Sequence, residues 1–136
     1  MQKIFTMEKK NPIEEAERYL QNAKDILREK AVKNGDSYQD AKYVKMAGDT
    51  AWKGCLIAVE AVFLVKSSKG KARTDVNDYK EAIAKRDKKL LTYFNEGYSA
   101  LHLSMGYDGS KDYYRCKRSI ELAELIISSC KSKYKA

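Results

Sequence analysis

Residues 113–134 read YYRCKRSIELAELIISSCKSKY, and this stretch decides the fold most clearly. Its apolar and aromatic side chains recur after alternating steps of three and four residues, at Tyr113, Cys116, Ile120, Ala123, Ile127, Cys130 and Tyr134. A helix with about 3.6 residues per turn places side chains at these intervals along a single stripe. The stretch is therefore predicted to be a helix that packs along neighbouring helices.

The same periodicity appears in three earlier segments. Pro12 follows Asn11, which is typical of a capped helix start, and that helix should run to Asn34 and Gly35. A second helix is expected over residues 38–66, and a third over 74–106 with a kink near 86–89. Apolar residues do not alternate with a period of two, so no sheet is predicted. The expected fold class is all-α, an up-down-up-down four-helix bundle.

The predicted second helix is rich in small residues. Gly48 and Gly54 each lower helix propensity by about 1 kcal/mol relative to alanine, so their presence inside a helix needs a packing reason. We expect another helix to approach closely on that side. Trp52 and Phe63 supply bulk on other faces, and we expect that a single bundle leaves one of them uncovered. This expectation is the basis for predicting a homodimer.

Length and composition restrict the class of protein. A chain of 136 residues is suited to one domain, here residues 11–134, with residues 1–10 as a flexible N-terminal segment. No apolar stretch reaches the roughly 20 residues needed to span a bilayer, and residues 1–10 lack the apolar core of a secretory signal. Three cysteines without a C-x-x-C spacing argue against disulfides and zinc, which favours a cytoplasmic protein.

The net charge of +8 makes an acidic partner a hypothesis to consider. The basic residues concentrate at 66–73, at 115–118 and in the tail at 131–135. In the expected bundle the first two groups fall at opposite ends, so they should not form one surface. We therefore predict weak binding of generic RNA or DNA at physiological salt.

Side chains suited to ligand binding gather around the turn between the third and fourth predicted helices. They are Tyr98, His102, Tyr107, Tyr113, Tyr114, Arg115 and Arg118. Aromatic rings beside guanidinium groups can stack a base or hold a phosphate, although tyrosines at helix ends also serve simply in packing. Lys53 is a further candidate for facing an anionic ligand. Its stripe of charges (Lys45, Asp49, Lys53 and Glu60) is also typical of a solvated helix face.

The order of features resembles the HEPN-like bundles, a group that includes the substrate-binding helical partners of bacterial nucleotidyltransferases. The resemblance rests on Ala16–Ala23, on Ala47, Ala51 and Lys53–Leu56, and on Ser119–Ile126. It is closest to an uncharacterised branch found mainly in Bacteroidetes. It implies a helical bundle and a protein partner such as a nucleotidyltransferase.

One departure from that group bears on activity. HEPN ribonucleases carry an arginine followed four to six residues later by a histidine, near the start of the last helix. Arg115 and Arg118 occupy that region, but the only histidine, His102, lies upstream. A nuclease of this kind needs an acid-base group beside its cation. We therefore expect no catalytic residues, no metal site and no cofactor.

These observations favour a non-enzymatic helical interaction module that binds a protein partner or a nucleotide-like ligand. The alternative is a nucleic-acid-associated or toxin-antitoxin-type protein that lacks the nuclease motif. An enzyme would require catalytic groups from a partner chain.

Overall fold

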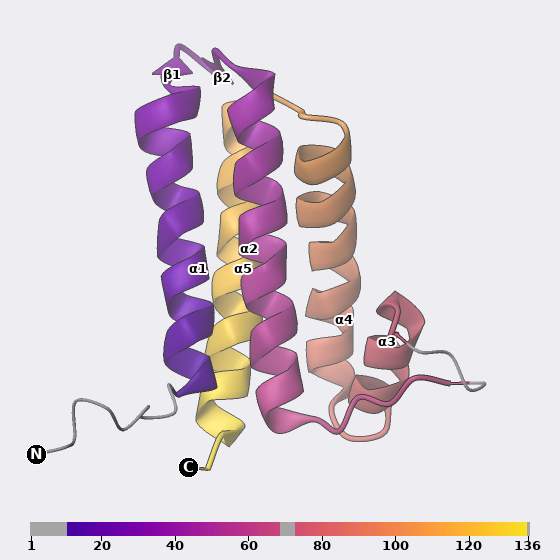
Figure 1. Ribbon diagram of the computed structural model, residues 1–136. Coiled ribbons are helices and arrows are strands. Elements are labelled where there is room, and N and C mark those ends of the chain that lie inside the picture. Colours follow the sequence, from indigo (N-terminus) through magenta and orange to yellow (C-terminus); the bar gives the residue numbers. More distant parts are fainter. Residues whose placement is uncertain (1–10, 69–72, 136) are drawn as a thin grey trace, which may run out of the picture.

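The computed structural model describes residues 11–68 and 73–135, and its long helices lie side by side (Figure 1). The predicted flexible segment 1–10 lies outside these residues. The fold is mostly helical, with one small two-stranded sheet. In chain order, with η denoting a π-helix, the elements are α1 (Pro12–Ile26), η2 (Leu27–Ala31), β1 (Lys33–Asn34), β2 (Ser37–Tyr38), α2 (Ala41–Val62), α3 (Val76–Ala84), α4 (Lys88–Gly97), η3 (Tyr98–Tyr107) and α5 (Tyr113–Lys133).

Helix α1 begins as predicted. The Asn11 side chain accepts a hydrogen bond of 2.8 Å from the Ile13 amide, and Pro12 occupies the first turn, where a missing N–H costs nothing. The predicted apolar stripe is buried at every position: Ile13, Ala16, Leu20, Ala23 and Leu27. The α-helical geometry ends at Ile26, continues as η2, and terminates at Val32, which has a φ of +56°. The helix is thus slightly shorter than predicted.

A hairpin that the sequence analysis did not predict connects α1–η2 to α2. Lys33 pairs with Tyr38 and Asn34 with Ser37, around a turn in which Gly35 has a φ of +67°. The prediction that the chain contains no sheet is therefore wrong. Strands of two residues are too short to show an alternating pattern, so only the turn residues Gly35 and Asp36 mark them.

Helix α2 starts later and ends earlier than predicted. The Asp40 carboxylate caps it by accepting from the Lys42 amide at 3.0 Å, because Tyr38 is occupied in β2. Phe63 already has extended backbone geometry.

The two glycines of α2 lie where other helices approach closely. A Cβ atom on Gly48 would lie 2.5 Å from the Cβ of Met105, and one on Gly54 would lie 2.9 Å from the carbonyl oxygen of Ala16. These distances confirm the predicted close packing.

The predicted third helix is interrupted. Asp75 and Asp78 form a reciprocal cap at the start of α3, and Asp87 caps α4 by accepting from the Leu90 amide at 2.9 Å. The expected kink at 86–89 is thus a complete break. An aspartate carboxylate competes with the backbone for amide hydrogens, so it favours a new helix start over a helix interior.

The core lies where the helical periodicity placed it. In α3, α4 and η3 all six predicted core residues are buried: Tyr79, Ile83, Leu90, Phe94, Leu101 and Met105. In α5 the five central positions of the stripe are buried: Cys116, Ile120, Ala123, Ile127 and Cys130. All three cysteines are free and buried, and burial raises the pKa of the Cys116 thiol to about 11. They act as small apolar residues of the core, as predicted.

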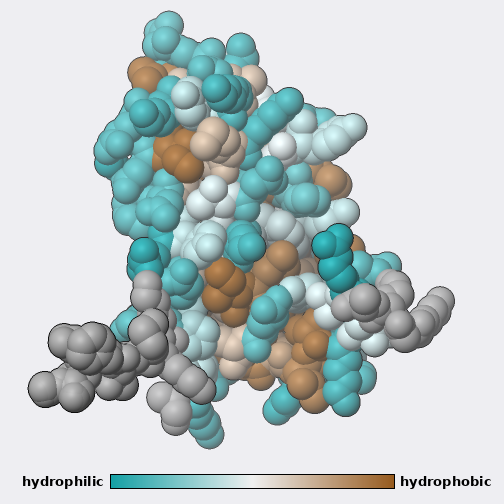
Figure 2. Space-filling model, in the orientation of Figure 1, coloured by the Kyte–Doolittle hydropathy of each residue, from teal (hydrophilic) through white to brown (hydrophobic). Residues whose placement is uncertain are grey.

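The surface does not support the reason given for a homodimer. Trp52 is 6% exposed and Phe63 is 4% exposed, so this chain covers both side chains by itself. That reason was wrong because neighbouring helices of the same chain cover α2, and Trp52, for example, packs against Phe94 of α4 and Tyr98 of η3. Figure 2 shows hydrophobic residues as separate patches on a largely hydrophilic face.

The start of α5 and the described residues on either side of 69–72 lie at opposite ends of the molecule. Helix α5 begins at the end that carries β1 and β2, whereas the residues flanking 69–72 lie beside α3 at the other end (Figure 1). Residues 69–72 themselves are outside the described part of the chain. None of the helices described here is both long and apolar enough to cross a membrane.

Candidate functional site

A groove lies between the junction of α1 with η2, the hairpin and the first turns of α5. Two backbone hydrogen bonds fix the hairpin to the start of α5: Tyr38 N–H donates to the Lys111 carbonyl at 2.8 Å, and Tyr113 N–H donates to the Asp36 carbonyl at 2.9 Å. An isolated bridge between Ser37 and Asp112 extends this contact. The hairpin therefore places β1 and β2 side chains directly beside the first turn of α5.

Two tyrosine rings form the aromatic part of this groove. The centroids of Tyr38 and Tyr113 are 5.7 Å apart, with their planes tilted by 45°. Tyr38 is buried, whereas Tyr113 is half-buried. Burial raises the pKa of Tyr38 to about 12, so its hydroxyl stays protonated at neutral pH and can donate a hydrogen bond. Tyr113 supplies the more accessible ring.

Positive charge surrounds these rings. The Lys33 ammonium lies 4.2 Å from the Tyr113 centroid, a distance typical of a cation–π contact. The groove has a volume of about 440 Å³ and is lined by Lys24, Leu27, Arg28, Lys33, Tyr38, Tyr113, Lys117, Ile120, Glu121 and Glu124.

The cations of the groove differ in how far they are neutralised. Lys24 is paired with Glu124 at 2.6 Å, and Arg28 binds the carboxylates of Asp25 and Glu29. Lys33 and Lys117 form no ion pair with any carboxylate in the described part of the chain. These two ammonium groups give the groove a surplus of positive charge beside an aromatic ring.

The predicted residues of the turn region are not brought together. Tyr113 lines the groove, and Tyr114 contacts it edge-on at 5.2 Å but is itself exposed. Arg115 is exposed, and its backbone N–H donates to the Asp112 cap. The Arg118 guanidinium lies 3.9 Å from Glu96 and 3.9 Å from Glu121, and Glu121 itself lines the groove. Arg115 and Arg118 are three residues apart, so they lie on neighbouring parts of the α5 surface, and neither lines the groove.

Tyr98 and His102 belong to a separate cluster around Trp52. Their rings are 5.4 Å apart, and they lie 5.9 and 6.4 Å from the Trp52 ring respectively. They therefore face α2 and not Tyr113. Tyr98 and Tyr113 thus point from their helices toward different neighbours.

Lys53 is exposed on α2, and two acidic residues of its charge stripe contact neighbouring helices. Asp49 lies 3.8 Å from Nδ1 of His102, and Glu60 accepts a hydrogen bond from the Tyr79 hydroxyl. The stripe that was predicted to face solvent thus also contacts η3 through Asp49 and α3 through Glu60.

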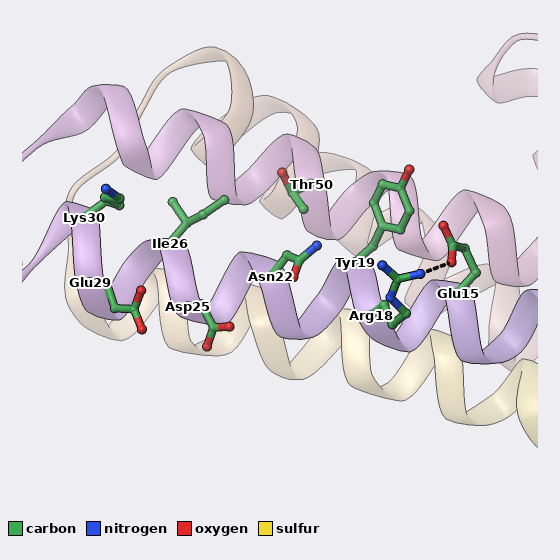
Figure 3. A pocket seen from close by; sticks show the side chains of 9 residues that line it. All are labelled: Glu15, Arg18, Tyr19, Asn22, Asp25, Ile26, Glu29, Lys30 and Thr50. Atoms are coloured by element: carbon green, nitrogen blue, oxygen red, sulfur yellow. Dashed lines mark hydrogen bonds and ion pairs between the residues drawn. The ribbon is translucent and has the colours of Figure 1, made fainter.

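A larger hollow lies between α1 and α2 and is drawn in Figure 3. It measures about 540 Å³ and is lined by Glu15, Arg18, Tyr19, Asn22, Asp25, Ile26, Glu29, Lys30 and Thr50. Figure 3 shows Arg18 turned toward Glu15, to which it is bound at 2.9 Å. Its acidic and basic side chains are mixed along one helix edge, so the hollow favours neither sign of ligand.

Sequence reasoning missed Lys33, Tyr38 and most of the other residues that line the groove, and it considered Lys117 only as part of the basic group at 115–118. The signal that could have found the hairpin is Gly35–Asp36, a two-residue turn that begins with glycine and so places Lys33 opposite Tyr38. Among the described residues, no three histidine, cysteine, aspartate or glutamate side chains are grouped so that they could hold a metal ion.

Comparisons with known proteins place the chain in a family. The model of DUF5618, a domain of unknown function, matches residues 11–132. The chain belongs to the DUF5618 family. A comparison with curated proteins finds no match. Among solved structures, a protein of unknown function from Dyadobacter fermentans is 47% identical, with a TM-score of 0.81, over 89% of this chain and 94% of that one. The DUF5618 fold is thus shared by that protein.

Proposed function

We propose that this DUF5618 protein is a non-enzymatic binding module that holds a nucleotide-like ligand in the groove between the hairpin and α5. The observation that carries the proposal is the placement of two ammonium groups without carboxylate partners, Lys33 and Lys117, beside the accessible ring of Tyr113. A base can stack on a tyrosine ring, and a phosphate can bind the ammonium groups.

The interaction energies favour a stacked base over the Lys33 ammonium as the contact of the Tyr113 ring. An exposed cation–π contact such as that of Lys33 with Tyr113 contributes about 0.5–1 kcal/mol, whereas a stacked base contributes about 1–3 kcal/mol. The flexible stem of Lys33 would allow its ammonium to move from the ring to the phosphate. The ligand would then gain both interactions at the cost of the weaker one.

Calorimetric titration of the full chain with adenosine 5′-monophosphate tests this function. Adenosine and ribose 5-phosphate, titrated separately, each retain only one half of the expected recognition and should bind more weakly. Tyr113→Ala should weaken binding by roughly tenfold, the loss of a stacked base. The matched control is Tyr107→Ala, because Tyr107 is 77% exposed and does not line the groove. No saturable heat at about 1 mM nucleotide, a free energy of roughly −4 kcal/mol, would reject the proposal.

The proposals on topology, location and partners rest on the resemblance to HEPN-like bundles. We propose that the chain forms an up-down-up-down bundle of four helices: α1–η2, α2, α4–η3 and α5. Helix α3 is then an additional short helix outside the bundle. A cytoplasmic location, a nucleotidyltransferase partner and a homodimer remain predictions. A molar mass from light scattering distinguishes monomer from dimer.

The alternative function, association with nucleic acid, rests on the same cations. Lys33 and Lys117 could contact a phosphate backbone, but β1 and the start of α5 lie at the end of the molecule opposite the described residues that flank 69–72. We therefore expect weak RNA binding at about 150 mM salt. Submicromolar RNA affinity that Arg115→Ala and Arg118→Ala abolish would favour this alternative.

A further inference from the structure

A second cavity, on the other side of α2, has a different chemistry from the groove. It measures about 300 Å³ and lies at the start of α3, where Trp52, Tyr79, Tyr98 and His102 supply four of its lining rings. Trp52 and Tyr79 are each 6% exposed and form its floor, whereas the His102 side chain is 46% exposed and lies at its rim. The cavity volume is at the lower end of the range for small-ligand sites.

Three of the rings that line this cavity lie close to one another. Tyr98 and His102 lie 5.9 and 6.4 Å from Trp52 and 5.4 Å from each other. Trp52 is held in place from behind by Phe94, whose ring lies 4.9 Å away. The faces of such rings carry partial negative charge and attract cations. One of them already does so, since the Lys80 ammonium lies 5.2 Å from the Tyr98 centroid.

The charged residues near the cavity also favour a cation. Asp75 lines it, Asp49 lies 3.8 Å from His102, and Glu60 accepts from the Tyr79 hydroxyl. The described residues that line the cavity include no lysine or arginine. The groove at the hairpin differs, since its lining side chains include four cations and two glutamates.

We propose that the Trp52–Tyr98–His102 cavity binds a small organic ammonium ion, such as a quaternary ammonium. A methylated ammonium is weakly hydrated, so it loses little solvation on entering an aromatic pocket and gains from each ring face it contacts. The site is independent of the nucleotide groove, because the two share no lining residue.

Choline is a suitable probe, and Trp52 is a built-in reporter because it is the only tryptophan in the chain. We expect choline to change the Trp52 fluorescence saturably. The neutral isostere 3,3-dimethylbutan-1-ol has the same shape without the charge, and it should bind roughly tenfold more weakly. Equal binding of both compounds, or no saturable change, would overturn the proposal.

Two substitutions at one position separate the role of the ring from the role of packing. Tyr98→Phe keeps the aromatic face and should retain choline binding, whereas Tyr98→Leu should weaken it by roughly tenfold. Unfolding midpoints establish that both variants are folded. Binding of adenosine 5′-monophosphate should be unchanged in Tyr98→Leu, so failure of this site and failure of the nucleotide groove are distinguishable. Equal loss of choline binding in Tyr98→Phe and Tyr98→Leu would contradict the cation–π basis.

Discussion

The Lys33 ammonium lies 4.2 Å from the centroid of the Tyr113 ring, although β1 and α5 are far apart in the sequence. The contact exists because Tyr113 N–H donates to the Asp36 carbonyl and so fixes the hairpin against the first turn of α5. This contact brings positive charge to an accessible ring at the point where the binding groove opens.

The first prediction compares two neighbouring cations of α5. Lys117 lines the groove without an ion pair to any described carboxylate, whereas Arg118 does not line it and lies 3.9 Å from both Glu96 and Glu121. Lys117→Ala should weaken binding of adenosine 5′-monophosphate by roughly tenfold, the value of one charged hydrogen bond. Arg118→Ala should leave it nearly unchanged. Equal effects in calorimetry would mean that charge alone, and not the groove, determines binding.

The second prediction concerns close packing at Gly48. A Cβ atom there would lie 2.5 Å from the Met105 Cβ and 2.6 Å from the Leu101 carbonyl oxygen. Gly48→Ala should therefore lower the free energy of unfolding by about 1–3 kcal/mol, despite the better helix propensity of alanine. Lys53→Ala, an exposed change on the same helix, should stay within about 0.5 kcal/mol. Urea denaturation measures both, and an unaffected Gly48→Ala would refute the packing.

A third prediction uses two residues with positive φ around the hairpin. Val32 has a φ of +56° and Gly35 has a φ of +67°. Side chains in this region cost about 1–2 kcal/mol, so Val32→Gly should raise the free energy of unfolding by about 1 kcal/mol. Gly35→Ala should lower it by about 1 kcal/mol through strain alone, since a Cβ there meets no atom within 4 Å. Thermal unfolding shifts of the same sign in the two variants would contradict this account.

The pH dependence of stability should depend on Asp87. A hydrogen bond from Lys133 at 2.7 Å, with the Leu90 amide, lowers the pKa of the Asp87 carboxyl below its ordinary value of 3.8. A carboxyl whose folded-state pKa is lowered adds stability that is present above its unfolded pKa and is lost as pH falls through the folded pKa. Asp87→Asn keeps a capping side chain but loses the ion pair.

Asp87→Asn should therefore cost about 0.5–1 kcal/mol at neutral pH, because the pair is partly exposed to solvent. The difference from the native chain should shrink as the pH falls below 3.8. Urea unfolding at several pH values gives both quantities. A cost that does not change with pH would show that the cap alone, and not the charge, is responsible.

The helical framework could be predicted because each long helix buries one stripe, and the stripes at Ile13–Leu27 and Tyr113–Cys130 follow the helical period. The break before α4 was harder to predict, since Asp87 is one charge among several and only its capping geometry distinguishes it. The hairpin was missed because two-residue strands leave no pattern.

The site was less predictable than the fold. Tyr113 was found as a candidate, but its partners Lys33 and Tyr38 lie far from it in sequence and depend on the hairpin that was missed. Tyr98 was placed with Tyr113 by sequence proximity. The Tyr98 ring faces Trp52 because of the rotational orientation of α4 and η3 relative to α2. The periodicity of the sequence alone does not determine this orientation.

The most direct test of the central claim is a map of amide chemical shifts for the full chain during titration with adenosine 5′-monophosphate. The account predicts saturable shifts concentrated at Lys33, Tyr38, Tyr113 and Lys117, with little change at Trp52 and Tyr98. Shifts centred on the Trp52 cavity or on the α1–α2 hollow, or no saturable shifts at all, would contradict it.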